Sequence, residues 1–179
     1  MGRPTTPSGR VSYPSVFKPT VNKLDKDKPA KYEITLLFEK GEPLTALQSE
    51  YDRVLREKWG GKPPKNLRSP FKDGDEKDDE NYAGMTYVTF KSLKKPDVRG
   101  PNLDSIDESS GELYPGCRAR VSFSCYGYEG PGIRPGVAFG LQNVQKTGDD
   151  DPFGSPRTSG DDDFEAVGAV AAGITDDDL

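Results

Sequence analysis

The sequence predicts a mainly β domain with five strands, one α-helix, long loops and a disordered acidic C-terminal tail. Sixteen prolines and twenty glycines favour a fold with many turns. Several short stretches alternate apolar and polar residues, as half-buried strands do, whereas a single stretch repeats apolar residues at helical spacing. A chain of 179 residues has room for one domain of roughly 120–150 residues plus tails.

The first two strands lie in the N-terminal third of the chain. Residues 1–9 are rich in Pro, Gly, Ser and Thr and are expected to form a flexible arm. Residues 10–18 predict a strand that is broken, or lies at a sheet edge, at Pro14. The clearest strand follows a lysine-rich turn, and its apolar face is expected to carry Tyr32, Ile34, Leu36 and Phe38.

One amphipathic helix of about four turns is predicted after the second strand. Pro43 is placed where a first turn would begin, and Gly60 and Gly61 end the pattern. We interpret Trp59 as a core anchor, with a ligand platform as the alternative. The apolar residues at helical spacing are Leu44, Leu47, Tyr51, Val54, Leu55 and Trp59.

The remaining strands are separated by two long loops, residues 61–84 and 93–112. Strands are predicted at 85–92, at 113–130 and, after a Pro/Gly-rich connection, at 136–146. Five strands with one helix and no βαβ rhythm favour a five-stranded barrel of the oligonucleotide-binding (OB) fold, over residues 10–146. An immunoglobulin-like sandwich is the main alternative, which the helix and the small number of strands disfavour.

Charge is divided sharply between the predicted domain and the tail. Residues 147–179 hold ten acids and one base, a net −9, whereas the whole chain is −5. Residues 1–146 therefore carry 24 bases and 20 acids, a net +4. A basic body can bind a polyanion, and a movable acidic arm can compete for the same groove or engage other proteins.

The composition argues against most catalytic and metal-binding functions. The chain has no histidine, which removes the usual general base and most zinc sites, so we expect a non-enzymatic protein without a cofactor. Cys117 and Cys125 are eight residues apart in one predicted strand, about 26 Å, which is beyond the ~7 Å limit for a disulfide. We expect both to be small core residues. The sequence shows no membrane span or signal core, so a cytoplasmic protein is expected.

The predicted strand from Cys117 to Tyr128 carries the clearest functional pattern. Its inner face is expected to hold Cys117, Ala119, Val121, Phe123 and Cys125, and its outer face Arg118, Arg120, Ser122, Ser124, Tyr126 and Tyr128. Arginines that meet phosphates, beside rings that stack on bases, suit a single strand of nucleic acid. The alternative is a solvated face with cross-strand packing. Tyr87 and Lys91 repeat the pairing of ring and base on a second strand.

Three further segments carry charged side chains that bear on function. The loop after the helix interleaves cations with rings, and from it we select Lys62, Lys65, Arg68 and Phe71 as candidate binding residues. Residues 10–18 show a weaker form of this pattern, with Arg10, Tyr13, Phe17 and Lys18. The acidic run at 73–80 lacks the glycine and spacing of a calcium loop, so we interpret it as solvated. A loose divalent-ion site or catalytic carboxylates are the alternatives.

Several segments, read in order, resemble a family of OB-fold single-stranded DNA-binding proteins encoded by tailed phages. They are RVSYPSVFKP, KYEITLLFEK, NYAGMTYVTFKS, LYPGCRARVSFSCYGYEG and GVAFGLQNVQK, and the likeness covers roughly residues 10–150. The resemblance implies sequence-independent coating of single-stranded DNA during phage replication or recombination in the bacterial cytoplasm. It also implies that the acidic tail modulates DNA binding and recruits phage or host replication or recombination proteins. Separately, a homodimer stays open at the level of sequence.

The end of the tail departs from the pattern of several such proteins. It reads Asp176, Asp177, Asp178, Leu179, without a terminal aromatic residue, so the resemblance identifies no particular tail partner. Two other functions stay open at the level of sequence. One is a phage β-barrel interaction or structural module without DNA binding. The other is a magnesium-dependent nuclease that uses the acids of residues 73–80.

Overall fold

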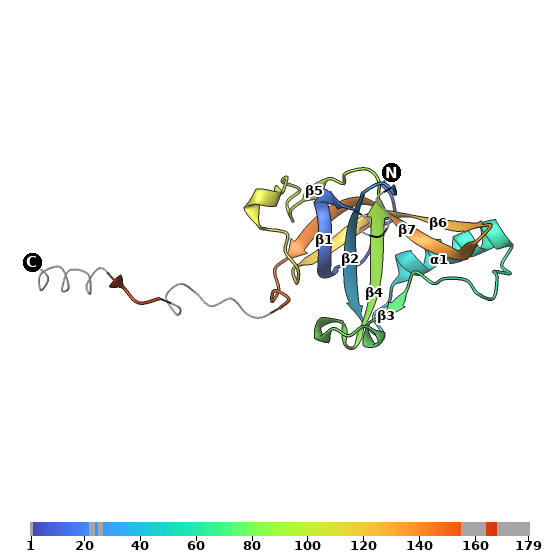
Figure 1. The fold of residues 1–179 in the computed structure, drawn as a ribbon, viewed down its shortest axis with the longest axis horizontal. Coiled ribbons are helices and arrows are strands. Elements are labelled where there is room, and N and C mark those ends of the chain that lie inside the picture. The colour runs from blue at the N-terminus through green and yellow to red at the C-terminus, as the bar shows by residue number, and fades with distance from the viewer. Residues whose placement is uncertain (1, 22–23, 25–26, 155–163, 168–179) are drawn as a thin grey trace, which may run out of the picture.

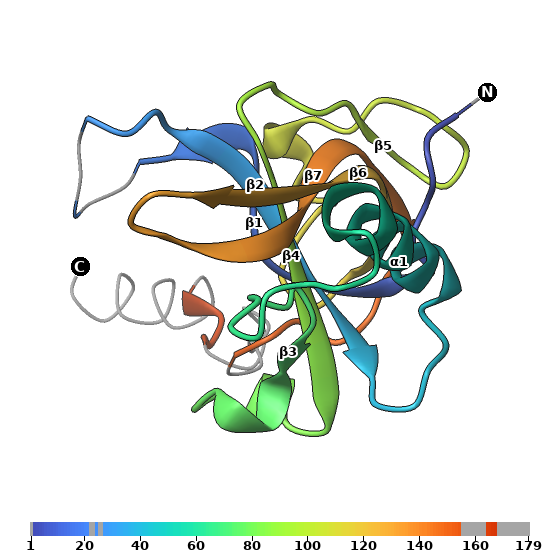
Figure 2. The same cartoon turned by 90° about the vertical axis from the view of Figure 1, so that its right-hand side faces the viewer.

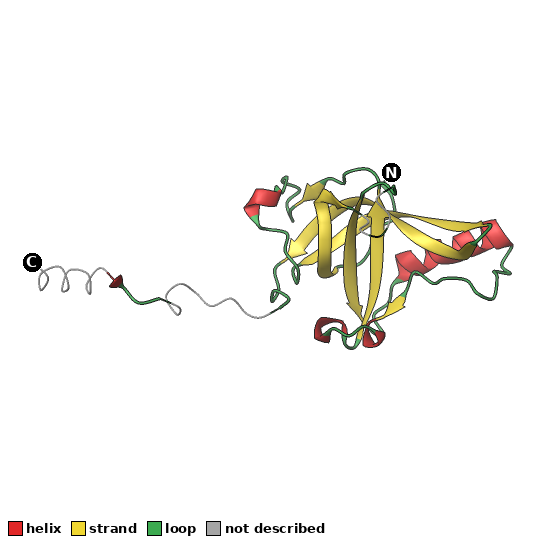
Figure 3. Cartoon of the chain, viewed as in Figure 1, coloured by secondary structure: helices red, strands yellow, loops and turns green. Residues whose placement is uncertain are grey.

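Five long strands form a closed ring with its core inside (Figures 1 and 3). The computed structural model describes residues 2–21, 24, 27–154 and 164–167. The five strands are β1 (Gly9–Thr20), β2 (Lys31–Glu39), β4 (Met85–Ser92), β6 (Arg118–Gly130) and β7 (Ile133–Gly148). Two-residue strands, β3 (Lys72–Asp73) and β5 (Val98–Arg99), extend the sheet at β4 and β7.

The ring closes because β4 and β7 pair with each other as well as with their antiparallel neighbours. The antiparallel pairs are β1–β2, β2–β4, β6–β7 and β1–β6. A short parallel pairing then joins Phe90 to Phe139 and Lys91 to Gly140. The predicted fold class, a mainly β domain of five strands with one helix, is confirmed.

Alternation along the strands delivers apolar side chains to the interior of the ring. On β6 the predicted inner face is buried from Ala119 to Cys125, while Arg118, Arg120 and Tyr126 are exposed. The rings of Phe90, Phe123 and Phe139 contact one another, with centroids 5.3–5.9 Å apart. Both cysteines are buried free thiols, as predicted.

The helix α1 (Thr45–Trp59) packs against β6. Leu47 and Val54 are buried, and Gly60 ends the helix in the left-handed conformation, where its N–H reaches the carbonyl of Arg56. The helix begins two residues after Pro43, later than the sequence indicated. Short 3₁₀ turns lie in the two long loops, at η1 (Gly74–Glu76), η2 (Glu80–Tyr82) and η3 (Glu108–Ser110).

Both ends of the predicted domain differ from the expected boundaries. Residues 4–6, expected in a flexible arm, lie along β6, where the Thr6 N–H donates to the Val121 carbonyl at 2.9 Å. The expected boundary after Lys146 cuts through β7, which continues to Gly148. The tail residues Asp161 to Asp163 and Asp176 to Leu179 lie outside the described residues.

None of the described helices is long and apolar enough to cross a membrane.

Replacing Phe123 by alanine should destabilise the domain by about 3–5 kcal/mol, because the cavity would open between the other two rings. Urea unfolding of the full chain measures this loss. The matched control is Phe164→Ala, since Phe164 is 76% exposed. Its free energy of unfolding should change by less than about 0.5 kcal/mol. Equal losses in the two variants would contradict the assignment of the core.

Candidate nucleic-acid interface

One groove gathers most of the predicted binding residues. It has a volume of about 460 Å³ and runs over the outer face of β2 and β4, beside the β6–β7 hairpin. Figure 2 shows the hairpin projecting next to the end of the β1–β2 pair. The lining residues are Tyr13, Lys31, Glu33, Thr35, Arg68, Ser69, Pro70, Lys72, Lys77, Tyr87, Thr89, Lys91, Tyr126, Tyr128, Val137, Ala138 and Phe139.

Strands β2 and β4 form the floor of the groove. Thr35 and Thr89 are paired in register, and their hydroxyl oxygens are 2.8 Å apart. Two residues further along each strand, on the same face, Glu33 is opposite Lys91, with the carboxylate 3.7 Å from the ammonium. Polar side chains in these places leave a floor that a sugar-phosphate chain can approach.

The β6–β7 hairpin forms one wall and presents Tyr126 and Tyr128. Tyr126 is 50% exposed, so a face or edge of its ring is accessible. A Cβ at Gly136 would lie 2.4 Å from the hydroxyl of Tyr128, so glycine is what lets that ring cross β7. Burial of part of the ring raises the pKa of Tyr126 above its usual value.

The hairpin wall is held in place by contacts with α1 and with the loop that follows it. From α1, the indole N–H of Trp59 donates to Glu129 at 3.1 Å, and Arg53 donates to the carbonyl of Cys125 at 3.3 Å. The Arg68 N–H donates to the Pro135 carbonyl at 2.8 Å. These contacts fix the tyrosines before any ligand arrives, which reduces the ordering cost of binding.

The groove is strongly cationic. Its lining holds five bases and one acid, although the whole chain is acidic. Neutral rings and ammonium or guanidinium groups in one depression suit a ligand that carries both flat bases and phosphates.

Five of the ten predicted binding residues line this groove, and the other five do not. Arg68, Tyr87, Lys91, Tyr126 and Tyr128 are brought together there. Lys62 and Lys65 are exposed in the loop after α1. The ring of Phe71 packs edge-on against Tyr51 and Phe139, at centroid distances of 5.6 and 5.8 Å, and supports the core.

The two arginines of β6 lie at the other end of that strand. Arg118 bonds to Asp150, and Arg120 donates to the side chain of Gln145 at 2.8 Å. Thirteen extended residues span roughly 40 Å, and the register shifts between Ser122 and Phe123. Residue alternation predicts that Arg118, Arg120 and the two hairpin tyrosines all face outward. It does not show that the arginines lie too far along β6 to line the groove with the tyrosines.

Sequence reasoning did not select Tyr13, Lys31, Lys72 and Lys77, which also line the groove. Tyr13 and Lys72 belong to segments in which cations and rings alternate, but nothing distinguished them from their neighbours. Lys77 lies inside the acidic run, where no pattern in the sequence points to it.

The acidic run contributes to local structure. Asp73 and Asp79 accept hydrogen bonds from the backbone of η1 and η2. Lys40 forms ion pairs with Asp73, at 2.7 Å, and with Asp75, and these contacts hold the pKa values of both carboxyls below their usual range. Within the described residues no three His, Cys, Asp or Glu side chains are close enough to hold a metal ion.

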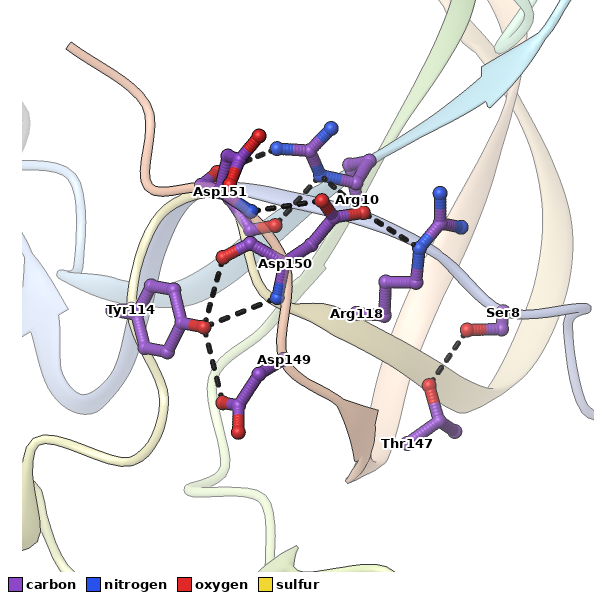
Figure 4. A network of polar contacts seen from close by, with 9 residues as sticks. Ser8, Arg10, Tyr114, Arg118, Thr147, Asp149, Asp150 and Asp151 are labelled. Atoms are coloured by element: carbon purple, nitrogen blue, oxygen red, sulfur yellow. Dashed lines mark hydrogen bonds and ion pairs between the residues drawn. The ribbon is translucent and has the colours of Figure 1, made fainter. Parts of the chain in front are cut away.

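The start of the acidic tail docks on the body away from the groove (Figure 4). The Oδ2 atom of Asp150 lies 2.9 Å from Nε of Arg118 and 3.5 Å from Nε of Arg10. The Tyr114 hydroxyl donates to Asp149 at 3.0 Å, and the guanidinium of Arg10 lies 4.7 Å from the ring centroid of Phe153. We call residues 149–153 the acidic clip.

Comparison with known proteins identifies relatives over nearly the whole chain. A family model described as the single-stranded DNA-binding protein of Enterobacter phage Enc34 matches residues 5–178. Putative protein p50 of Acyrthosiphon pisum secondary endosymbiont phage 1 is 28% identical over 155 residues, which cover 80% of this chain and 82% of that protein.

Solved structures show the same fold. The single-stranded DNA-binding protein of bacteriophage Enc34 in complex with single-stranded DNA has a TM-score of 0.71 at 24% identity, and the match covers 84% of this chain and 88% of that one. Bacteriophage T7 gp2.5, also a single-stranded DNA-binding protein, has a TM-score of 0.58 at 15% identity, covering 90% and 96%.

Asp150→Asn should lower the stability of the domain at pH 7. The backbone N–H of Asp151, then Arg118 and Arg10, hold the pKa of Asp150 below its usual range. This contribution is therefore present above the unfolded pKa, about 4, and is lost as the pH falls through the folded value. Urea midpoints of the variant and the unmodified chain should converge between about pH 5 and pH 2.

The control for this pH profile is Glu165→Gln, which removes the same charge from an exposed position of the tail. It should leave the midpoint unchanged at every pH. A loss for Asp150→Asn that does not depend on pH would contradict a role for the carboxylate charge.

Proposed function

Because the chain belongs to the Enterobacter phage Enc34 single-stranded DNA-binding protein family, we propose that it binds single-stranded DNA in the groove between β2, β4 and the β6–β7 hairpin. The observation that carries this proposal is the meeting of four tyrosines with five bases in one groove. Tyr87, Tyr126 and Tyr128 come from two separate parts of the sheet, and the fold brings them together.

The mechanism divides between charge and stacking. Lys31, Arg68, Lys72 and Lys91 neutralise phosphates and release counterions, while tyrosine rings stack on bases at about 1–3 kcal/mol each. Every base has a flat face and every nucleotide a phosphate, so this mode of binding does not depend on sequence. Single-stranded DNA fits because its bases are free to stack, whereas duplex DNA keeps them inside the helix.

The biological role that follows is non-enzymatic coating of single-stranded DNA. Such a protein protects exposed strands during phage replication or recombination in the cytoplasm of the bacterial host. Tail partners among phage or host replication proteins, and a homodimer, stay predictions. The roles of Asp176, Asp177, Asp178 and Leu179 in recruiting a partner also stay predictions, because these residues lie outside the described part of the chain.

The acidic tail is proposed to compete with DNA for the cationic groove. Asp149 and Asp150 of the acidic clip already form ion pairs with the folded domain. The acids that compete with DNA are therefore those that follow the clip in the chain. Residues 155–179 carry seven acids and one base, a net −6. A segment of 25 residues spans up to roughly 80 Å when fully extended, which is about twice the length of β6.

Titration with labelled oligo-dT, followed by fluorescence anisotropy at several salt concentrations, tests the proposed function. The logarithm of affinity should fall with the logarithm of salt by about 0.7 per phosphate contacted. Lys91→Ala should reduce that slope by about 0.7, whereas Lys94→Ala, an exposed lysine that does not line the groove, should leave it unchanged.

Absence of oligo-dT binding would sink the proposal and favour an interaction module. Incubation of the same oligonucleotide with the protein and magnesium separates a binder from a nuclease, since a binder leaves the strand intact.

Deleting residues 155–179 should tighten oligo-dT binding, because the deletion removes a −6 competitor but retains β7 and the acidic clip. The gain should shrink as salt rises, since screening weakens the competition. A truncated chain with unchanged affinity at low salt would contradict the competition and leave only partner recruitment for the tail.

A further inference from the structure

Tyr13 has a backbone conformation that side chains rarely adopt. Its φ is 46°, in the left-handed region, at the point where β1 shifts register against β2 and just before Pro14. Its side chain is 60% exposed, so packing in the core gives no compensation for this strain. Strained backbone that carries an exposed aromatic ring is typical of a binding site.

The ammonium of Lys77 lies close to three tyrosine rings. Its ammonium lies 5.2 Å from the ring centroid of Tyr13, 4.6 Å from that of Tyr82 and 5.3 Å from that of Tyr87. Its sequence neighbours Glu76 and Asp78 are acids, yet none of the ion pairs among the described residues involves Lys77. The ammonium is therefore open to an anion that enters the groove.

The segment that carries Lys77 is firmly anchored. A Cβ at Gly74 would lie 2.0 Å from the carbonyl oxygen of Tyr82, so this turn packs closely on its neighbour. Tyr82 is buried, and its hydroxyl is 2.6 Å from that of Ser12 on β1. Lys40 and the backbone N–H of Gly84 both bond to Asp75. These contacts hold Lys77 beside β1.

Tyr13 and the hairpin tyrosines face the groove from opposite sides. In the sheet, β1 borders β2, whereas the hairpin strand β7 borders β4. A strand of DNA that lies across β2 and β4 would meet Tyr126 and Tyr128 at one wall and Tyr13 with Lys77 at the other.

We propose that Tyr13 and Lys77 form a further nucleotide subsite, in which a base stacks on Tyr13 and the ammonium of Lys77 pairs with a neighbouring phosphate. This inference rests on the proposed function. A phosphate carries a full negative charge and attracts the ammonium more strongly than the aromatic rings do. When the ammonium of Lys77 moves from the rings to the phosphate, the faces of Tyr13 and Tyr87 become free for a base.

The decisive variant is Tyr13→Gly, because glycine adopts positive φ without strain. If Tyr13 serves DNA, the variant should unfold at the same or a higher temperature and bind oligo-dT about 5- to 150-fold more weakly, the equivalent of one lost base stack. If Tyr13 serves only to hold Lys77 in place, the variant should unfold at a lower temperature and bind oligo-dT as the unmodified chain does. That second result would overturn the subsite.

Leu103→Gly is the matched control. Leu103 is the other non-glycine residue with positive φ in the described part of the chain, at 69°, and it is 66% exposed outside the groove. The control should relieve backbone strain and leave oligo-dT affinity unchanged.

Lys77 is tested through the salt dependence. Lys77→Ala should lower the slope of log affinity against log salt by about 0.7, and Lys77→Arg should keep it. An unchanged slope for Lys77→Ala would overturn the phosphate contact. Failure of the unmodified chain to bind oligo-dT would instead refute the proposed function, so the two failures are distinguishable.

Discussion

The short parallel pairing between β4 and β7 is the constraint on which the rest of the structure depends. It joins Phe90 to Phe139, and these two rings meet Phe123 of β6 in the core. Parallel strands need a long connection, and here that connection contains the long loop of residues 93–112 and the whole of β6. Apolar contact among the three rings supplies the attraction that offsets the entropy of closing so long a loop.

Closure of the ring also builds the candidate binding groove. Because β7 is fixed against β4, the β6–β7 hairpin projects beside the outer face of β2 and β4. Trp59 from α1 and the backbone of Arg68 then brace the hairpin, so its tyrosines face Tyr87 in a fixed arrangement. The same contacts that stabilise the domain therefore position the rings for stacking.

Charge is sorted by place within an acidic chain. Asp73 and Asp75 are paired with Lys40, and the acidic clip is paired with Arg10, Arg118 and Lys146. In the groove, by contrast, five bases face a single acid. Local pairing of carboxylates elsewhere leaves a cationic surface that the net charge of −5 conceals.

The sequence by itself determined the five long strands, the helix, the buried face of β6 and the division of charge, because each follows from local periodicity or composition. Even the outer position of Arg118 and Tyr128 was readable. Only the tertiary structure decided that these two residues lie in different places, with Arg118 at the acidic clip and Tyr128 in the groove. It alone brought Lys77 from an acidic run onto three tyrosine rings. Alternation fixes which way a side chain faces, whereas the meeting of distant residues depends on how the strands close into a ring.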